Sequence, residues 1–193
     1  MRWLILSVYL VQFIEIIWFP IPSDVSTLRL VRSGERRPWV LLTVGLLGIF
    51  TFHLPLLFIT YPEILKQMTP LLPPGLQPIP AFMTMSFLLL GSAFTILGVR
   101  ALRMRQKNAP DALTTAGIYR ICRHPINLGL MLIMVGFILV YPYWIMVPGA
   151  VAFFYNLHTR SCWEEKRLLL VHGEGYQAYQ RRVAMYGLRV KPK

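Results

Sequence analysis

The stretch from Ile126 to Leu157 contains no charged side chain. A transmembrane helix needs about 20 consecutive apolar residues to cross the hydrocarbon core of a bilayer. This stretch is too long for one untilted span and slightly short for two, and Pro142 divides it between two tyrosines. Because proline interrupts a helix, the sequence predicts a tight hairpin of two membrane helices, over 127–141 and 143–157.

Three further apolar segments precede this hairpin, at 3–19, 39–60 and 81–99. Hydrophobic residues make up 55% of the 193 residues, and the mean hydropathy is +0.53. A soluble domain of this length does not need so much apolar surface. We therefore expect an all-α fold, a polytopic membrane protein with five transmembrane helices in a single domain spanning 1–193.

The first apolar segment differs from a secretory signal peptide. It has one basic residue before it, Arg2, carries Glu15 within it, and shows no small-x-small cleavage pattern before Pro20. We expect a retained membrane helix.

Positive charge is distributed unevenly along the chain, whose net charge is +12. Apart from Arg2 and Lys66, every Lys and Arg lies in loop 20–38, in loop 100–125 or after Leu157. With five spans these segments share one face, and the positive-inside rule places the N-terminus outside and the C-terminus in the cytoplasm. Orientation and attraction to anionic membrane lipid explain the charge, and no nucleic-acid partner is expected.

Metal binding and disulfide bonding are not expected. Cys122 and Cys162 are the only cysteines, both fall on the predicted cytoplasmic face, and they lack the His/Cys spacing of a zinc site. Free thiols are predicted.

The remaining segments connect or follow the spans. Six prolines in 61–80 predict an outer loop of extended or turn structure, and the polar residues 100–116 predict an inner loop. After Leu157 we expect the helix to continue to Gly173 and Gly175, followed by a short helix from Tyr176 to about Tyr186. The result is a cytoplasmic helical tail folded onto the membrane surface.

Polar residues bracket the predicted hairpin at both ends. Gly117-Ile118-Tyr119 and Arg123-His124-Pro125 precede it, and Arg160 and Glu164-Glu165 follow it. Because both ends of a hairpin return to the same membrane surface, we predict that these residues form one site. Proline suits the first turn of a helix, and the N–H groups near His124 can hold a carboxylate.

One face of the last predicted helix carries Asn156, Arg160 and Glu164 at i, i+4 and i+8. An isolated Arg160–Glu164 pair is more simply an ordinary surface ion pair. Likewise, a histidine before proline is more often a helix start than a ligand contact. Their proximity to each other favours a functional interpretation.

These motifs together resemble the isoprenylcysteine carboxyl methyltransferase family, in particular its short prokaryotic members. The resemblance rests on the run from Ala112 to Tyr119, on Arg123-His124-Pro125 with Gly129, and on Glu164-Glu165 followed by Leu168, Gly173, Tyr176, Tyr179 and Val183. It covers about residues 111–185. Asn127 stands where most members have tyrosine.

The resemblance implies S-adenosyl-L-methionine as methyl donor and S-adenosyl-L-homocysteine as product. It implies that Arg160 faces the substrate as the catalytic arginine. The cofactor contacts that it implies are Ala112, Leu113, Thr114, Tyr119, His124, Pro125, Ile126, Asn127 and Glu164. The implied reaction is methyl transfer to a lipidic acceptor, most directly the carboxylate of a prenylated cysteine, with no obligate protein partner.

Three alternatives remain open. A carboxylate acceptor is already ionised, so orientation and water exclusion are enough, whereas a phospholipid amine acceptor needs a base, for which His158 and Glu165 are the candidates. An NADPH-dependent sterol-type reductase would use a basic clamp, and arginines occur at 100–105. A membrane scaffold or small carrier would need no cofactor site.

Overall fold

The computed structural model describes residues 2–18, 38–72, 81–108 and 112–187. Every regular element in these ranges is helical, which confirms the all-α prediction. The elements are α1 (Arg2–Trp18), α3 (Pro38–Thr60), the 3₁₀-helix η2 (Pro62–Gln67), α4 (Ala81–Asn108), the 3₁₀-helix η4 (Gly117–Arg120), α5 (Pro125–Val140) and α6 (Met146–Arg182).

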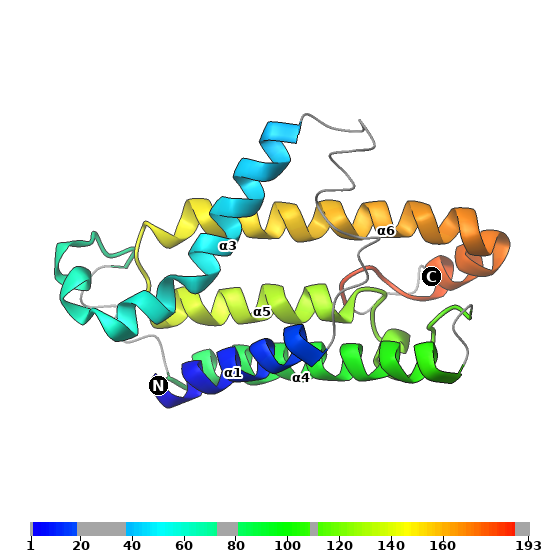
Figure 1. Cartoon of the computed structure of the whole chain (residues 1–193), viewed down its shortest axis with the longest axis horizontal. Coiled ribbons are helices and arrows are strands. Elements are labelled where there is room, and N and C mark those ends of the chain that lie inside the picture. Colours follow the sequence, from blue (N-terminus) through cyan, green and yellow to red (C-terminus); the bar gives the residue numbers. More distant parts are fainter. Residues whose placement is uncertain (1, 19–37, 73–80, 109–111, 188–193) are drawn as a thin grey trace, which may run out of the picture.

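Helix α5 lies at the centre of the bundle, packed between α4 and α6, while α1 contacts α4 and α3 crosses α6 obliquely (Figure 1). The α5–α6 hairpin is present as predicted, with Pro142 in its turn. There the N–H of Leu71 donates to the Pro142 carbonyl at 2.5 Å, and the N–H of Trp144 donates to the Thr69 carbonyl at 3.2 Å. Figure 1 places this turn at one end of the bundle and residues 112–124 at the other, with the end of α6.

Small residues let α4 and α5 approach closely. A Cβ atom added to Gly91 would lie 2.6 Å from the carbonyl oxygen of Gly129, a distance that real side chains do not tolerate. Close backbone contact at small residues is typical of helices packed in membranes. Gly98, further along the same α4–α5 contact, lies against Pro125 and Ile126. This line of glycine contacts, the glycine seam, therefore holds the first turn of α5 against α4.

Two helix boundaries differ from those predicted. Helix α4 continues to Asn108, so the prediction of a loop beginning at residue 100 was wrong. Residues 100–108 are mostly good helix formers, and Arg105 and Lys107 in the last turn favour the helix C-terminus. Helix α6 breaks at Gly173 (φ 50°, ψ −124°) as predicted, but its final part ends at Arg182.

The predicted loop 61–80 is only partly described. Residues 62–67 form η2, with Pro62 in its first turn, in place of extended structure. Residues 73–80, the basic loop 20–37 and the basic residues after 187 lie outside the described ranges, as does the side chain of Glu15.

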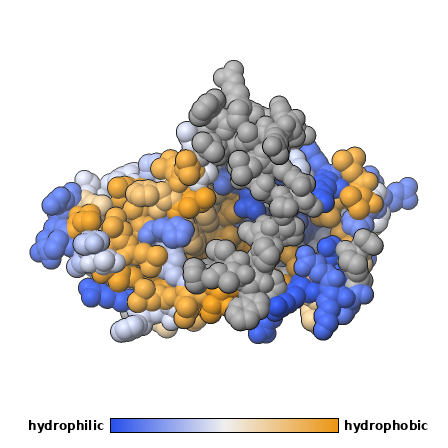
Figure 2. All heavy atoms as spheres, in the orientation of Figure 1, coloured by the Kyte–Doolittle hydropathy of each residue, from blue (hydrophilic) through white to orange (hydrophobic). Residues whose placement is uncertain are grey.

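One helix, Phe82–Asn108, is by itself long and apolar enough to cross a membrane, and shorter apolar helices cover Arg2–Val11, Gly45–Thr60 and Pro125–Val140. Large apolar side chains are exposed on α1, α3, α4 and α6, among them Leu10, Ile49, Phe50, Leu89, Leu90 and Val151. On the face shown in Figure 2, hydrophobic residues predominate across the middle and hydrophilic ones gather at the ends. An exposed apolar surface of this kind is typical of a contact with a membrane or a partner.

Candidate active site

A tight turn before α5 places Tyr119 in the interior. Gly117 adopts φ 61°, a left-handed conformation that favours glycine, and the following 3₁₀ turn buries Tyr119. The Tyr119 carbonyl accepts a 2.6 Å hydrogen bond from the hydroxyl of Tyr179, which lies beyond the Gly173 break in α6. The last part of α6 therefore holds the 3₁₀ turn at Tyr119 in place.

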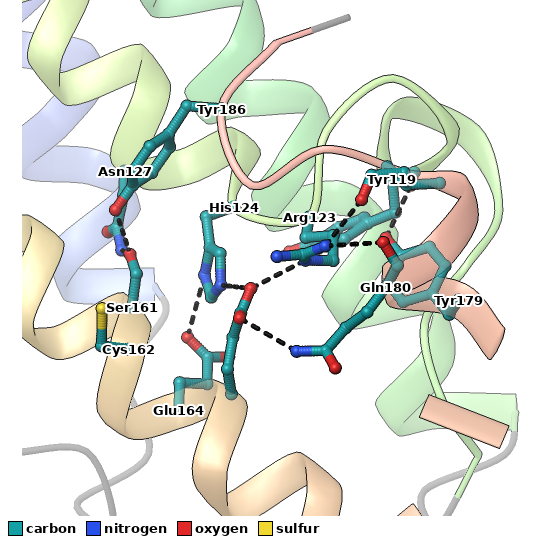
Figure 3. A network of polar contacts seen from close by, with 12 residues as sticks. Tyr119, Arg123, His124, Asn127, Ser161, Cys162, Glu164, Tyr179, Gln180 and Tyr186 are labelled. Carbon is teal, nitrogen blue, oxygen red and sulfur yellow. Dashed lines mark hydrogen bonds and ion pairs between the residues drawn. The ribbon is translucent and has the colours of Figure 1, made fainter. Parts of the chain in front are cut away.

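Arg123 joins the same loop to the chain after α6 (Figure 3). Its Nε donates to Oε1 of Glu165 at 2.7 Å, and its Nη1 donates to the carbonyls of Val183 at 2.7 Å and Gln180 at 3.1 Å. The Gln180 side chain donates to the other oxygen of Glu165 at 3.0 Å. Backbone bonds from Arg123 to Ala184 and from His124 to Met185 extend the contact. Arg123 thus holds residues 180–185 against the loop before α5.

His124, at the N-cap of α5, lies between two carboxylates (Figure 3). Its Nε2 is 3.2 Å from Oε1 of Glu165, its Nδ1 is 3.4 Å from Oε2 of Glu164, and its side chain is 4% exposed. Burial is the largest single effect and disfavours the imidazolium, but the hydrogen bonds and charges of the two carboxylates together outweigh it. The pKa of His124 is therefore raised.

The two neighbouring glutamates have different surroundings. Burial by itself would raise the pKa of Glu165, but hydrogen bonds from His124 and Arg123, together with their charges, lower it. The side chain of Glu165 is 13% exposed and that of Glu164 is 41% exposed. Glu165 is ionised and already bonded to protein groups, whereas the carboxylate of Glu164 has lone pairs that a ligand can reach.

A second polar group lies beside His124, between α5 and α6. Ser161 is fully buried and accepts hydrogen bonds from the Asn127 amide at 2.7 Å and from the Tyr186 hydroxyl at 2.6 Å. Burial raises the pKa of Tyr186 to about 12, so the phenol stays protonated as a donor. The centre of the Tyr186 ring lies 6.1 Å from that of the His124 ring and 6.0 Å from that of the His158 ring, so Tyr186 adjoins both histidines.

Sequence reasoning placed Arg123 in the predicted site without a role of its own, and it did not place Ser161 or Tyr186 there. Leu157, which is buried, Ser161 and Glu165 follow one another at intervals of four residues. This spacing indicates one inward face of α6. Nothing local to Tyr186 signals that the tail returns to this position.

Arg160 lies one turn before Glu164 and is partly buried. Burial lowers the pKa of its guanidinium, and the charge of Glu164 partly offsets this effect. An arginine keeps its proton at neutral pH even so. Among the described residues, Arg160 forms no hydrogen bond and no ion pair within 4.0 Å.

The remaining predicted residues lie on both sides of this centre. The Ala112 carbonyl accepts a 3.0 Å hydrogen bond from Arg105 of α4, and the nearby Thr114 hydroxyl is buried without a partner among the described residues. Pro125 and Ile126 pack on Gly98 of α4, so they position the start of α5. Tyr119, His124, Asn127 and Glu164 do gather where the start of α5 packs against α6.

Residues 80–174 match the family described as phospholipid methyltransferase. Comparisons with curated proteins and with solved structures gave no match. The matched span runs from α4 past the glutamates to the kink in α6, so it contains the whole predicted cofactor set, and the family implies a donor of the S-adenosylmethionine type. Residues 80–174 of this chain are thus similar to the phospholipid methyltransferase family, which lies within the isoprenylcysteine carboxyl methyltransferase-like superfamily of membrane methyltransferases.

Proposed function

We propose that this protein transfers a methyl group from S-adenosylmethionine to a lipidic acceptor at the inner surface of a membrane. The proposal rests mainly on one observation: the two glutamates beside His124 differ in their hydrogen-bond partners and in their exposure. Arg123, His124 and Gln180 occupy Glu165, which leaves the partly exposed Glu164 to receive a ligand.

The residues around Glu164 fit such a cofactor. S-adenosylmethionine presents a ribose diol, an amine, a carboxylate, an adenine ring and a cationic sulfonium, and when bound it supplies an electrophilic methyl group. Glu164 can accept hydrogen bonds from the diol or the amine, and the buried ring of Tyr119 offers an apolar face for adenine. The Thr114 hydroxyl is a buried polar group that still lacks a partner among the described residues.

The proposal also includes a topology of five membrane spans. The N-terminus lies outside, and the C-terminus and the active site lie in the cytoplasm. Two observations support this topology: the start of α5 and the loop before it lie away from the α5–α6 turn, toward the other end of the bundle (Figure 1), and apolar side chains are exposed on four helices. The donor would then arrive from the cytoplasm, and the acceptor would enter sideways from the bilayer between helices.

Arg160 favours a carboxylate acceptor, such as that of a prenylated cysteine. A partly buried guanidinium that forms no ion pair within the described ranges attracts and orients an anion. A carboxylate also needs no general base. That suits a site in which Glu165 is held ionised by Arg123 and His124.

A phospholipid amine is a second candidate acceptor, favoured by the description of the matched family. An amine must lose a proton before or during the transfer. Since Glu165 is occupied, the exposed His158, beside Tyr186 and 3.5 Å from Cys162, is the more suitable base of the two. The family match also favours a methyltransferase over the NADPH-dependent reductase and over a scaffold.

The test is transfer of a labelled methyl group by purified protein in lipid nanodiscs. The donor would be methyl-labelled S-adenosylmethionine, and the acceptors would be N-acetyl-S-farnesylcysteine and phosphatidylethanolamine. We expect base-labile label on the farnesylcysteine, lost in Glu164→Gln and kept in Glu174→Gln, a matched control at an exposed position. Label on the phosphatidylethanolamine alone would replace the carboxylate acceptor with the amine. No transfer to either acceptor by folded protein would contradict the proposed acceptor classes.

A further inference from the structure

Two polar atoms near the cytoplasmic end of α4 are buried without a hydrogen-bond partner among the described residues. They are Nε of Arg105 and the hydroxyl oxygen of Thr114. Nη1 of Arg105 donates to the carbonyl of Ala112 at 3.0 Å, which holds the guanidinium against the loop that carries Thr114. Buried donors are nearly always paired in folded proteins, so two unpaired ones on adjoining segments point to a ligand with acceptor atoms.

Arg105 also lies close to the residues already assigned to the site. The pKa of the Tyr119 phenol is raised mainly by burial and next by the negative charge of Glu164, while the positive charge of Arg105 acts in the opposite direction. A cation from α4 and an anion from α6 therefore both act on one buried side chain. This arrangement matches a ligand that carries both a negative and a positive group.

The start of α5 is a poor place for the negative group. Both ring nitrogens of His124 already face carboxylates, at 3.2 Å and 3.4 Å. A further carboxylate there would meet the like charges of Glu164 and Glu165, which disfavour it. The unpaired donors at Arg105 and Thr114 belong to α4 and to the loop after it, and neither atom is paired with a carboxylate among the described residues.

We propose that Arg105, assisted by the Thr114 hydroxyl, binds the carboxylate of the amino-acid end of S-adenosylmethionine. This inference rests on the proposed methyltransferase function and extends it to the orientation of the donor. A guanidinium presents parallel N–H groups that match the two oxygens of a carboxylate. With the carboxylate on Arg105, Glu164 is left for the amine or the diol, so opposite charges on α4 and α6 fix the donor along Tyr119.

The test compares three ligands by isothermal titration: S-adenosylhomocysteine, its decarboxylated analogue, and 5′-methylthioadenosine, which lacks the whole amino-acid end. For the wild type we expect the decarboxylated analogue to bind about tenfold or more weakly than S-adenosylhomocysteine. For Arg105→Gln we expect a loss of that size for S-adenosylhomocysteine and little change for the other two ligands. Arg100→Gln, at an exposed position on the same helix, is the charge-matched control and should bind all three like the wild type.

Thr114→Val provides a second variant that keeps the charge and the Arg105–Ala112 bond. We expect a smaller loss, again confined to S-adenosylhomocysteine. Equal wild-type affinity for S-adenosylhomocysteine and its decarboxylated analogue would overturn the inference without any variant. Equal weakening of all three ligands by Arg105→Gln would also overturn it, because Arg105 would then only support the loop. Either result leaves the methyltransferase intact, whereas a wild type that binds none of the three overturns both proposals.

Discussion

At the residue scale, the site depends on two adjacent glutamates that face different neighbours. Glu165 lies on the inward side of α6 and forms hydrogen bonds with Arg123, His124 and Gln180. Glu164 contacts His124 and extends toward solvent. One group stabilises the fold and the other remains available to a ligand, so their substitutions should have separable effects.

Replacing Glu165 by Gln should destabilise the protein, and replacing Glu164 by Gln should not. The first change leaves Arg123 and His124 with no buried counter-charge, which costs about 3 kcal/mol, whereas the second affects an exposed contact worth about 0.5 kcal/mol. Unfolding in detergent measures the stability, and S-adenosylhomocysteine titration should show loss of binding in the Glu164 variant. Equal destabilisation by the two changes would contradict this division of roles.

The same cluster predicts how stability depends on pH. His124 has a raised pKa, so its contribution is complete below its ordinary value of 6.5 and is lost as the pH rises through the folded value. Glu165 has a lowered pKa, so its contribution is complete above 4.5 and is lost as the pH falls through the folded value. The network should therefore stabilise most between about 4.5 and 6.5.

Thermal unfolding from pH 5 to pH 9, for the wild type beside His124→Asn, measures this effect. The difference in unfolding temperature should be largest at the acidic end and shrink as the pH rises. A difference that grows toward alkaline pH would show that His124 is neutral in the folded protein.

At the element scale, the glycine seam between α4 and α5 places the start of α5. Gly91 should not tolerate even alanine, because the added Cβ would lie 2.6 Å from the backbone oxygen of Gly129. The helices must then separate, at a cost of about 1–3 kcal/mol. Gly175→Ala is the matched control, since nothing lies within 4 Å of its added Cβ.

Unfolding in detergent should show Gly91→Ala as the less stable of the two variants, and S-adenosylhomocysteine titration should show weaker binding because the seam reaches Pro125. Equal stability of the two variants would mean that the close contact at Gly91 does not limit the packing of α4 on α5.

Elements with a local cause could be predicted from the sequence. Pro142 within an uncharged run predicted the α5–α6 hairpin, and Gly173 predicted the break in α6. The helical extension of α4 was missed because polar residues suit a solvated helix as well as a loop. The role of Tyr186 was also missed, since its contact with Ser161 depends on bonds from Arg123 to residues about 60 positions away.

The helical phase of α6 explains how much of the arrangement around Glu164 could be predicted from the sequence. The spacing of Asn156, Arg160 and Glu164 predicted one face of the helix, and Glu164 does reach His124. The adjacent inward face, with Ser161 and Glu165, could be recognised only once the packing of α6 on α5 was known. Local spacing predicted the residues near the site, and tertiary packing determined their partners.

At the scale of the whole molecule, the proposed topology separates the two ends of the bundle by the membrane. Lys66 in η2 and Glu174 after the kink should lie on opposite sides, because α4, α5 and α6 intervene. Single cysteines at these positions, in a background with Cys122 and Cys162 replaced, can be labelled with a membrane-impermeant maleimide. In intact cells we expect labelling of Lys66→Cys alone, and after lysis labelling of both. Labelling of both in intact cells would contradict the topology.

The central claim is that the cluster around Glu164 binds S-adenosylmethionine, and titration tests it most directly. S-adenosylhomocysteine and NADPH would be added separately to the detergent-purified protein, as wild type and as Glu164→Ala. We predict that the wild type binds S-adenosylhomocysteine with micromolar affinity, that Glu164→Ala stays folded but does not bind it, and that NADPH binds to neither. Binding of NADPH alone, or of neither compound to folded wild type, would contradict the claim.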